Sequence, residues 1–432
     1  MAPARADVVV IGAGYTGLWT AYYLLVADPC LDVVILEAEH VGFGASGRNG
    51  GWVSALWPVS MDVVAASHGR AGALALGAAL RDTVDEVGRV AAAEGIDAAY
   101  AKGGTLTVAR GPAQVSRARA YAADGARWGD GTEWLEPAAA RERLAAEGLG
   151  GATYNPNCAR VHPGRLVRGL ADVVRRRGGR VVEGARVTDI GDRRVTVADG
   201  STVLARHVVR ATEAWTARLP RLRRHVAPVY SLMVATEPLS PGQWETIGLQ
   251  ERETVSDHEH VVIYGQRTDD DLVAFGGRGA PYHWGSGIRP GFDVEPAVFE
   301  RLRRTLRGLL PQLDGVGFTH AWGGPLGIPR DWHPSVGYDE STGQGWAGGY
   351  VGDGLAATNL AGRTLADLVL GRPSPVTALP WVGHHSPAWE PEPLRWLGVN
   401  AGLRLARAAD LEERLTGRPA RLGGLLAALT AH

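Results

Sequence analysis

The chain has 432 residues, with 45 basic and 46 acidic side chains, a net charge of −1 and an apolar fraction of 45%. This length predicts two or three domains with a substantial core, the balanced charge gives no support for a nucleic-acid partner, and no apolar run reaches the roughly 18 residues of a membrane span. Residues 1–6 are too few for a signal peptide and two cysteines make neither a disulfide scaffold nor a metal motif, so we expect a cytoplasmic protein with no metal and no stable membrane insertion, and homo-oligomerisation stays open.

A glycine turn lies between the first predicted strand and the first predicted helix. Gly12, Gly14 and Gly17 follow an apolar run at the spacing Gly-x-Gly-x-x-Gly, and a second apolar run ends at Glu37. This layout binds the ADP half of a dinucleotide, because the glycines admit a tight turn, the pyrophosphate and close helix packing, while the acid accepts hydrogen bonds from the ribose. A glycine-rich turn in another α/β fold is the alternative. The cofactor-binding residues predicted here are Gly12, Gly14, Tyr15, Thr16, Gly17, Glu37 and Ala38.

A loop of small residues follows, where a nicotinamide dehydrogenase would usually return to a helix. Residues 44–51 read Gly-Ala-Ser-Gly-Arg-Asn-Gly-Gly, and such a loop lets the backbone run close along an extended ligand. The segment resembles the FAD-dependent oxidoreductases of the D-amino acid oxidase-like family, and most of all their γ-glutamylputrescine oxidase branch. The resemblance implies that the loop follows FAD towards the isoalloxazine, with room at N5 left by the last two glycines. It places at the cofactor Ser46, Arg48, Asn49, Gly50 and Gly51.

The middle of the chain alternates helical and strand patterns. Helical periodicity covers 60–100, 116–129, 134–147 and 166–174, and strand patterns cover 103–109, 180–183, 187–190, 195–197, 203–204 and 207–210. Residues 207–215 resemble the strand and turn that close over ADP in the same family, although Glu213 stands where a glycine or asparagine is usual. The resemblance adds to the cofactor site Val187, Ala211, Thr212 and Trp215.

A second glycine turn begins at residue 348 and leads into a helix that ends near Gly371. In the family this helix points its N-terminus at the pyrimidine edge of the flavin, where its positive end stabilises negative charge at N1 and O2. Asp353 would oppose an anionic flavin unless its side chain points away. The residues that the resemblance places at the cofactor here are Gly324, Gly352, Asp353, Gly354, Leu355 and Ala356.

These patterns predict an α/β fold in which a Rossmann-like FAD-binding domain is interleaved with an antiparallel β-sheet substrate domain and followed by a C-terminal helical tail. Strands at 226–236, 261–266 and 272–277 and a helix at 296–310 form the sheet domain. The tail is expected to pack on its own domain or a neighbouring subunit. The predicted boundaries are 1–90, 150–220 and 321–373 for the FAD-binding domain, 91–149 and 221–320 for the substrate domain, and 374–432 for the tail.

The substrate is predicted from one departure from the family pattern. Amino-acid oxidases of the family hold the substrate carboxylate with an arginine, for which a bidentate guanidinium is suited, and Leu326 stands at the matching position. The substrate is therefore expected to be a small amine, although Arg330 could restore an anion site. The catalytic candidates are Gly51, Tyr264, His260 and Arg330. The candidates for an aromatic cage around an ammonium are Tyr230, Tyr264, Trp284, Trp322 and Trp332, with ordinary sheet packing as the alternative.

The cofactor is expected to be noncovalent FAD, because neither Cys30 nor Cys158 falls where relatives attach their flavin. The cluster 257–260 has metal-like residue types, but it is interpreted as a solvated turn. We expect an FAD-dependent enzyme that oxidises the C–N bond of an amine to an imine by hydride transfer to flavin N5, with O2 as the acceptor and H2O2 as a product. The alternatives are a dehydrogenase or biosynthetic tailoring enzyme with another acceptor, and a flavin-binding protein without catalysis.

Overall fold

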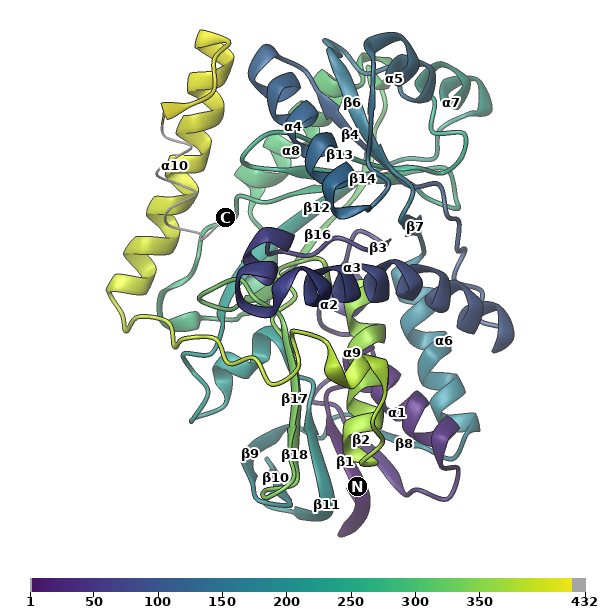
Figure 1. The fold of residues 1–432 in the computed structure, drawn as a ribbon, viewed down its shortest axis with the longest axis vertical. Helices are drawn as coiled ribbons and strands as arrows, with labels where there is room; N and C mark the ends of the chain where they lie inside the picture. Colours follow the sequence, from purple (N-terminus) through teal and green to yellow (C-terminus); the bar gives the residue numbers. More distant parts are fainter. Residues whose placement is uncertain (1, 422–432) are drawn as a thin grey trace.

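The computed structural model describes residues 2–421, which form two large sheets and a two-stranded ribbon (Figure 1). The first sheet runs in the order β17-β18-β11-β1-β2-β8, with β9 and β10 continuing from β11. Its strands are β1 (Arg5–Ile11), β2 (Val33–Leu36), β8 (Arg180–Val182), β9 (Val187–Gly191), β10 (Arg194–Val197), β11 (Thr202–Arg210), β17 (Ser335–Asp339) and β18 (Gln344–Gly348).

Parallel pairing brings the carboxyl ends of the central strands to one edge. β1 pairs in parallel with both β2 and β11, and Ile11 is the register partner of Leu36 and of Arg210. Arg210 in turn pairs with Trp346 in β18. The turn after β1, the acid after β2 and the segments after β11 and β18 therefore meet at the edge where open α/β sheets bind ligands.

Two helices cover the middle of this sheet and build the main core. α1 (Tyr15–Ala27) and α9 (Gly354–Val369) cross closely because Gly362 lies against Trp19, where a Cβ would come within 2.5 Å of the Trp19 Cβ. α6 (Pro163–Arg176) and α3 (Met61–Ala93) complete the layer. By length and composition alone, α3 is apolar enough to cross a membrane, but a core helix meets the same test and its buried residues join this core.

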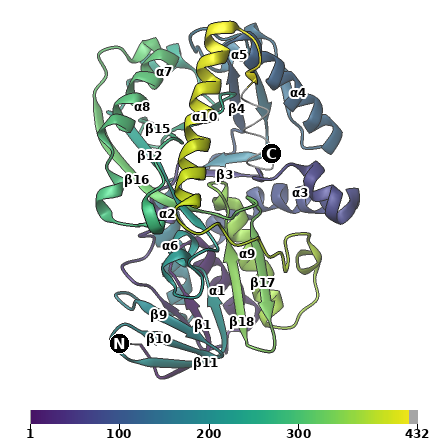
Figure 2. The same cartoon turned by 90° about the vertical axis from the view of Figure 1, so that its left-hand side faces the viewer.

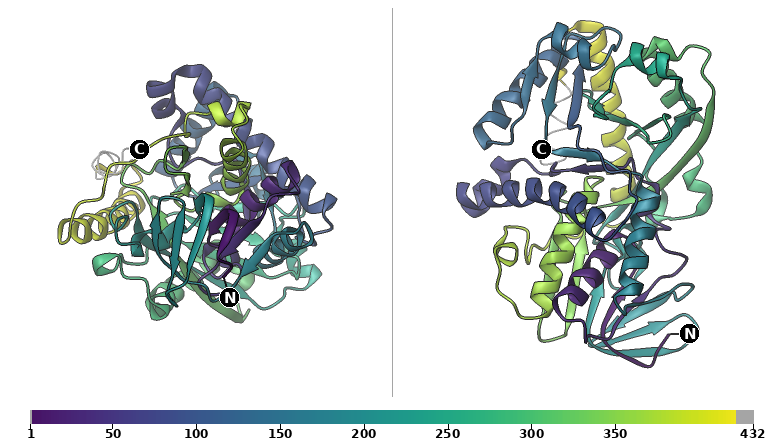
Figure 3. Two further views of the ribbon diagram at one scale, coloured as in Figure 1. Left: turned by 90° about the horizontal axis from the view of Figure 1, so that it is seen from below. Right: turned by 90° about the vertical axis from the view of Figure 1, so that its right-hand side faces the viewer.

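The second sheet lies above the first and forms the roof of the space between them (Figure 1; Figure 3, right). Its order is β16-β12-β15-β14-β13-β4-β6-β5. Its strands are β4 (Thr105–Ala109), β5 (Glu133–Leu135), β6 (Gly151–Asn155), β12 (Ala227–Thr236), β13 (Thr254–Asp257), β14 (Ile263–Arg267), β15 (Val273–Gly277) and β16 (Phe318–Ile328), and its helices are α4 (Pro112–Trp128), α5 (Pro137–Arg143), α7 (Pro241–Ile247) and α8 (Pro296–Leu309). Between the sheets lie α2 (Ala45–Arg48) and the ribbon of β3 (Trp52–Ser54) and β7 (Cys158–Arg160).

The C-terminal helix α10 (Leu394–Thr416) runs along the side of the roof (Figure 2). The Asp410 carboxylate accepts hydrogen bonds from the backbone N–H groups of His260 and Val261, at 2.7 and 3.0 Å. Arg117 of α4 donates to Glu413 of α10. The described part of the tail thus packs on the protein's own roof; the prediction for residues 422–432 lies outside the described residues.

The predicted fold class is confirmed, and the differences concern the limits of elements. The strands expected at 203–204 and 207–210 are the single strand β11. The segment expected as a helix at 134–147 contains most of the strand β5 and the shorter, seven-residue helix α5. β6 and β16 belong to the roof although the sequence boundaries at 150 and 321 assign all of β6 and most of β16 to the FAD-binding domain. Pairing between strands that are far apart in the sequence decides which sheet a strand joins, and this pairing cannot be predicted from local periodicity.

Candidate active site

A cavity of about 750 Å³ opens at the carboxyl edge of the first sheet and extends to the underside of the roof. This volume falls in the range of cofactor and ligand sites. Segments that are far apart in the sequence line it together: the turn after β1, the loop around α2, the turn after β11 and the turn before α9. The three nucleotide segments predicted from the sequence therefore converge on one cavity.

The turn after β1 forms one end of the cavity. Gly12 has a φ of +106°, which glycine adopts without strain, and a Cβ there would lie 2.6 Å from the Ala211 carbonyl oxygen. The Glu37 carboxylate accepts the Ala13 N–H at 2.8 Å and the Glu39 N–H at 2.9 Å. Burial raises the pKa of Glu37 and these hydrogen bonds oppose the shift. The side chain is thus fixed at the lip of the cavity, where its remaining lone pairs can accept from hydroxyl groups.

The loop around α2 is held by its own polar side chains. Ser46 Oγ accepts the Tyr15 N–H at 2.9 Å, and Asn49 both accepts the Gly51 N–H at 2.8 Å and donates to the Ser46 carbonyl at 2.8 Å. Arg48 forms an ion pair with Asp293 at 2.6 Å. These contacts fix the backbone that lines the cavity, so the side chains act on a ligand mainly by positioning the loop.

The turn before α9 is strained and is clamped from two sides. Val351 has a φ of +58°, which is an outlier for a β-branched residue, and such a conformation persists only where surrounding contacts impose it. Arg278, which follows β15, donates to the Val351 carbonyl at 3.1 Å. Glu213 accepts the Gly349 N–H at 3.5 Å. The N-terminus of α9 is therefore aimed into the cavity by side chains from two other segments.

Glu213 is a half-buried acid within this clamp. It begins the 3-10 helix η1 (Glu213–Arg218) with a φ of +42°. Burial raises the pKa of Glu213 to about 7, against the lowering effect of backbone N–H groups and of the Arg210 charge. Burial also lowers the pKa of Arg210 to about 10. Glu213, which stands where the family usually has glycine or asparagine, thus adds a carboxylate that accepts hydrogen bonds from glycine N–H groups.

The roof contributes a phenol above the loop. Tyr264 in β14 shares a hydrogen bond of 2.8 Å with the Ser231 hydroxyl, and burial raises the pKa of Tyr264. A Cβ on Gly50 would lie 2.8 Å from Tyr264 Cε2. Gln266 on the same strand donates to the Gly50 carbonyl at 2.6 Å. The glycine loop therefore passes directly beneath the roof sheet and is fixed to it.

Most predicted site residues line the cavity, and five do not. Gly17 and Ala356 are buried in α1 and α9, and a Cβ on Gly51 would overlap Val161 and Gln266. Gly51 is thus required by close packing against the Val161 carbonyl and the roof side chain Gln266. The predicted residues that line the cavity are Gly12, Gly14, Tyr15, Thr16, Glu37, Ala38, Ser46, Arg48, Asn49, Gly50, Val187, Ala211, Thr212, Trp215, Tyr264, Gly324, Gly352, Asp353, Gly354 and Leu355.

The structure does not bring His260 or Arg330 to the cavity. His260 Nε2 lies 3.2 Å from Glu413 on α10, and with Asp410 the three form a cluster of metal-ligand types. Arg117 fills that cluster, because it contacts both His260 and Glu413. Arg330 pairs with Glu390 at 3.0 Å. Both predicted side chains have protein partners, which the sequence pattern did not reveal.

Of the five predicted cage aromatics, Tyr264 alone lines the cavity within residues 2–421. Trp284 is 61% exposed, and Trp322 donates its indole N–H to the Arg48 carbonyl at 2.9 Å. Tyr230 is buried against roof side chains, and Arg278 lies 5.5 Å from the Trp332 ring. Cavity-lining residues that the sequence prediction missed include Phe43, Trp52, Ser231, Ser256, Glu213 and Arg278. The alternation of residues in β12 and β13 indicates which side chains share a face of the strand, but it does not predict that this face covers a ligand.

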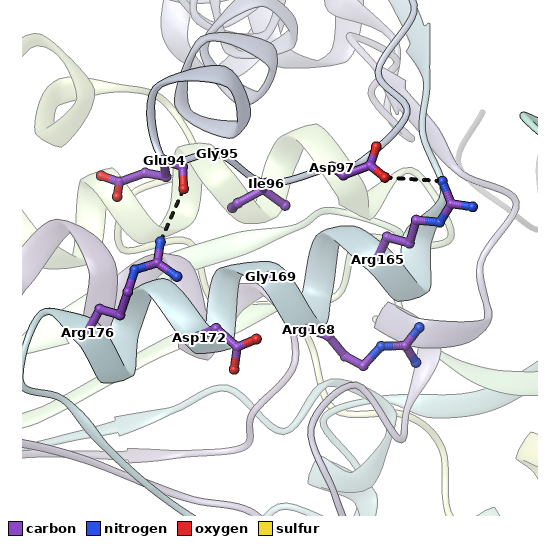
Figure 4. A pocket seen from close by; sticks show the side chains of 9 residues that line it. All are labelled: Glu94, Gly95, Ile96, Asp97, Arg165, Arg168, Gly169, Asp172 and Arg176. Carbon is purple, nitrogen blue, oxygen red and sulfur yellow. Dashed lines mark hydrogen bonds and ion pairs between the residues drawn. The ribbon is translucent and has the colours of Figure 1, made fainter.

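A smaller hollow of about 320 Å³ lies between the end of α3 and α6 (Figure 4). Its charged lining is largely paired within the protein: Arg165 lies 3.5 Å from Asp97, and Arg176 donates to the Glu94 carbonyl at 3.1 Å. It contains neither of the glycine turns, so the chemistry is assigned to the larger cavity.

Comparison with known proteins agrees with this geometry. The profile of the family described as FAD dependent oxidoreductase, DAO, matches residues 7–368. The chain belongs to this family. It is 33% identical over 371 residues to gamma-glutamylputrescine oxidoreductase of Escherichia coli, covering 84% of each chain, and 27% identical over 378 residues to glycine oxidase of Geobacillus kaustophilus, covering 84% of this chain and 93% of the relative. The crystal structure of the latter enzyme matches the fold with a TM-score of 0.73 at 22% identity, over 86% of this chain and 96% of that one.

The protein is accordingly an FAD-dependent oxidoreductase, and its cavity fits FAD. Glycines 12 and 14 form a cradle that side chains would fill, since a Cβ on Gly14 would lie 2.8 Å from Ser46 Oγ. Glu37 lies at the end suited to the ribose, and the N-terminus of α9 faces the same cavity. The residues that would hold FAD are thus the glycine turns, the α2 loop and the segment after β11.

Proposed function

We propose that the protein oxidises the C–N bond of a small amine to an imine, with noncovalent FAD as hydride acceptor and O2 as final oxidant. The observation that supports it is Leu326, whose apolar side chain lines the cavity where the family's amino-acid oxidases present a carboxylate-binding arginine. The 33% identity with gamma-glutamylputrescine oxidoreductase supports an amine as the substrate class.

FAD held by the glycine turns and the α2 loop would supply the redox chemistry, as the acceptor of a hydride from the carbon next to nitrogen, and its reoxidation would give O2 two electrons and two protons to form H2O2. The amine loses that hydride and a proton to become an imine, which water hydrolyses to a carbonyl compound and an amine or ammonia. The free N–H groups of α9 would stabilise negative charge on the reduced ring. The Tyr264 phenol stays protonated because burial raises its pKa, so it can donate a hydrogen bond in the cavity.

Noncovalent attachment is supported by the composition of the cavity wall. Within residues 2–421 its lining includes no cysteine and no histidine. Cys30 is exposed, and Cys158 is a buried residue of the ribbon strand β7. We also propose that the enzyme works in the cytoplasm on a free small molecule.

Anaerobic flavin bleaching tests the proposal. The purified yellow protein is mixed without O2 with γ-glutamylputrescine, n-butylamine, sarcosine, glycine and D-alanine, and the flavin absorbance is followed. We expect the amines that carry no carboxylate next to the reacting carbon to bleach the flavin fastest, and added O2 to restore the colour with one H2O2 per substrate. Rapid bleaching by D-alanine or glycine would contradict the amine assignment. Slow recovery of colour in O2 would favour a dehydrogenase, and a flavin that none of these compounds bleaches would favour a binding protein.

A further inference from the structure

Among the residues that the structure describes, one carboxylate in the cavity has no protein partner. The other charged side chains that line the cavity are hydrogen-bonded or ion-paired. Arg48 pairs with Asp293, for example, and Arg278 donates to the Val351 carbonyl. Within residues 2–421 the Asp353 carboxylate lines the cavity without a hydrogen bond or an ion pair. Leu326 lies beside this turn, because a Cβ on the adjacent Gly352 would come within 3.4 Å of Leu326 Cδ1.

This orientation is unusual for the position that Asp353 occupies. It is the N-cap residue of α9, where an aspartate ordinarily accepts a hydrogen bond from the first turn. Its backbone has a φ of −90° and a ψ of 40°, and the side chain forms no cap hydrogen bond. Both the first N–H groups of α9 and the carboxylate consequently remain available in the cavity. The helix can interact with negative charge, and the carboxylate with positive charge.

The groups around Asp353 do not neutralise it by contact. Arg278 is the charged side chain that lowers its pKa, but within the described chain no carboxylate lies within 4.0 Å of Arg278. Burial alone raises the pKa of Asp353, to about 6. Within residues 2–421 the Asp353 carboxylate thus feels the Arg278 charge at a distance but has no ion pair within 4.0 Å.

We infer that Asp353 binds the ammonium group of the substrate and selects amines whose reacting carbon bears no carboxylate. The inference rests on the proposed function. A partly buried carboxylate and an ammonium form a charge-assisted hydrogen bond that is stronger than a neutral one. A carboxylate on the same carbon would be brought against the Asp353 anion and the methyl groups of Leu326, where neither accepts it. The same two residues therefore favour the amine and disfavour the α-amino acid.

Binding of an unreactive amine tests the inference without turnover. tert-Butylamine has no hydrogen on the carbon that carries nitrogen, and tert-butanol is its neutral analogue; both are titrated into the FAD-loaded enzyme while the flavin absorbance is recorded. We expect Asp353→Asn to weaken tert-butylamine by about tenfold, equivalent to 1.4 kcal/mol, and to leave tert-butanol unchanged. The matched control is Asp367→Asn on the same helix, outside the cavity, which should bind like the wild type. Equal affinity of the wild type and Asp353→Asn for tert-butylamine would overturn the inference.

A second measurement leaves Asp353 in place. Glu213 also lines the cavity and burial raises its pKa to about 7, so the pH profile is recorded on Glu213→Gln, in which this acid cannot ionise. Because tert-butylamine stays protonated throughout, its affinity for Glu213→Gln should follow ionisation of Asp353 and weaken by about tenfold between pH 7 and pH 5. A flat profile over that range would contradict the inference even if the asparagine variant did not retain FAD. If no amine bleaches the wild-type flavin, the proposed function is wrong. If amines bleach the flavin with the same KM in the wild type and in Asp353→Asn, the role of Asp353 is wrong and the proposed function stands.

Discussion

Replacing Glu213 with glutamine should change how stability depends on pH. Burial raises the pKa of Glu213 from its ordinary 4.5 to about 7. Since the pKa is higher in the folded protein, the folded state holds the proton more tightly, and stability falls as the pH rises from about 4.5 to about 7. Integrating the two titrations between pH 5 and pH 8 gives a loss of about 2.5 kcal/mol from this group.

Glutamine keeps an acceptor for the Gly349 N–H but does not ionise. The difference in unfolding free energy between Glu213→Gln and the wild type should therefore move in favour of the variant by about 2.5 kcal/mol from pH 5 to pH 8. Guanidinium denaturation of the FAD-saturated proteins, followed by tryptophan fluorescence, measures it. The exposed Glu340→Gln is the control and should show no such trend. A difference that is constant with pH would refute the buried, proton-binding role of Glu213.

Four further outcomes follow from the structure. Gly14→Ala places a methyl group 2.8 Å from Ser46 Oγ and should weaken FAD by about tenfold in a fluorescence titration, whereas Gly402→Ala on α10 meets open space and should retain wild-type affinity. Asp410→Ala leaves two backbone N–H groups without their acceptor and should lower the free energy of unfolding by about 2–3 kcal/mol, with an unchanged flavin spectrum. Leu326→Arg should accelerate anaerobic bleaching by D-alanine by about tenfold, and an unchanged rate would count against the substrate argument. Acid precipitation should release the yellow colour into the supernatant, and colour retained in the pellet would show a covalent flavin.

The nucleotide half of the site could be predicted because its signals are local. The spacing of the glycines in residues 12–17, the apolar runs on either side and the acid at position 37 are short-range features that the backbone conformation requires directly. The second glycine turn and the helix after it are equally local. Parallel pairing then brings these segments together at one edge of the sheet, as β1, β2 and β11 show.

The substrate half depended on contacts between distant segments. His260 has a side chain suited to catalysis and precedes the roof strand β14. It instead contacts Glu413 of α10, which is 153 residues further along the chain. Arg330 is engaged by Glu390 in the same way. No sequence motif marks Arg278 as a site residue. It lies in the cavity because the pairing of β15 with its neighbours decides where the residue after that strand lies.

Residue types at fixed short spacings were enough to predict the family, the cofactor and the order of the cofactor segments. Three features could be seen in the folded chain alone: Asp353 leaves its helix uncapped, Glu213 binds glycine N–H groups, and Gly51 is required by packing. The direction and environment of a side chain are set by the elements packed around it, and those elements come from parts of the chain that local patterns do not connect.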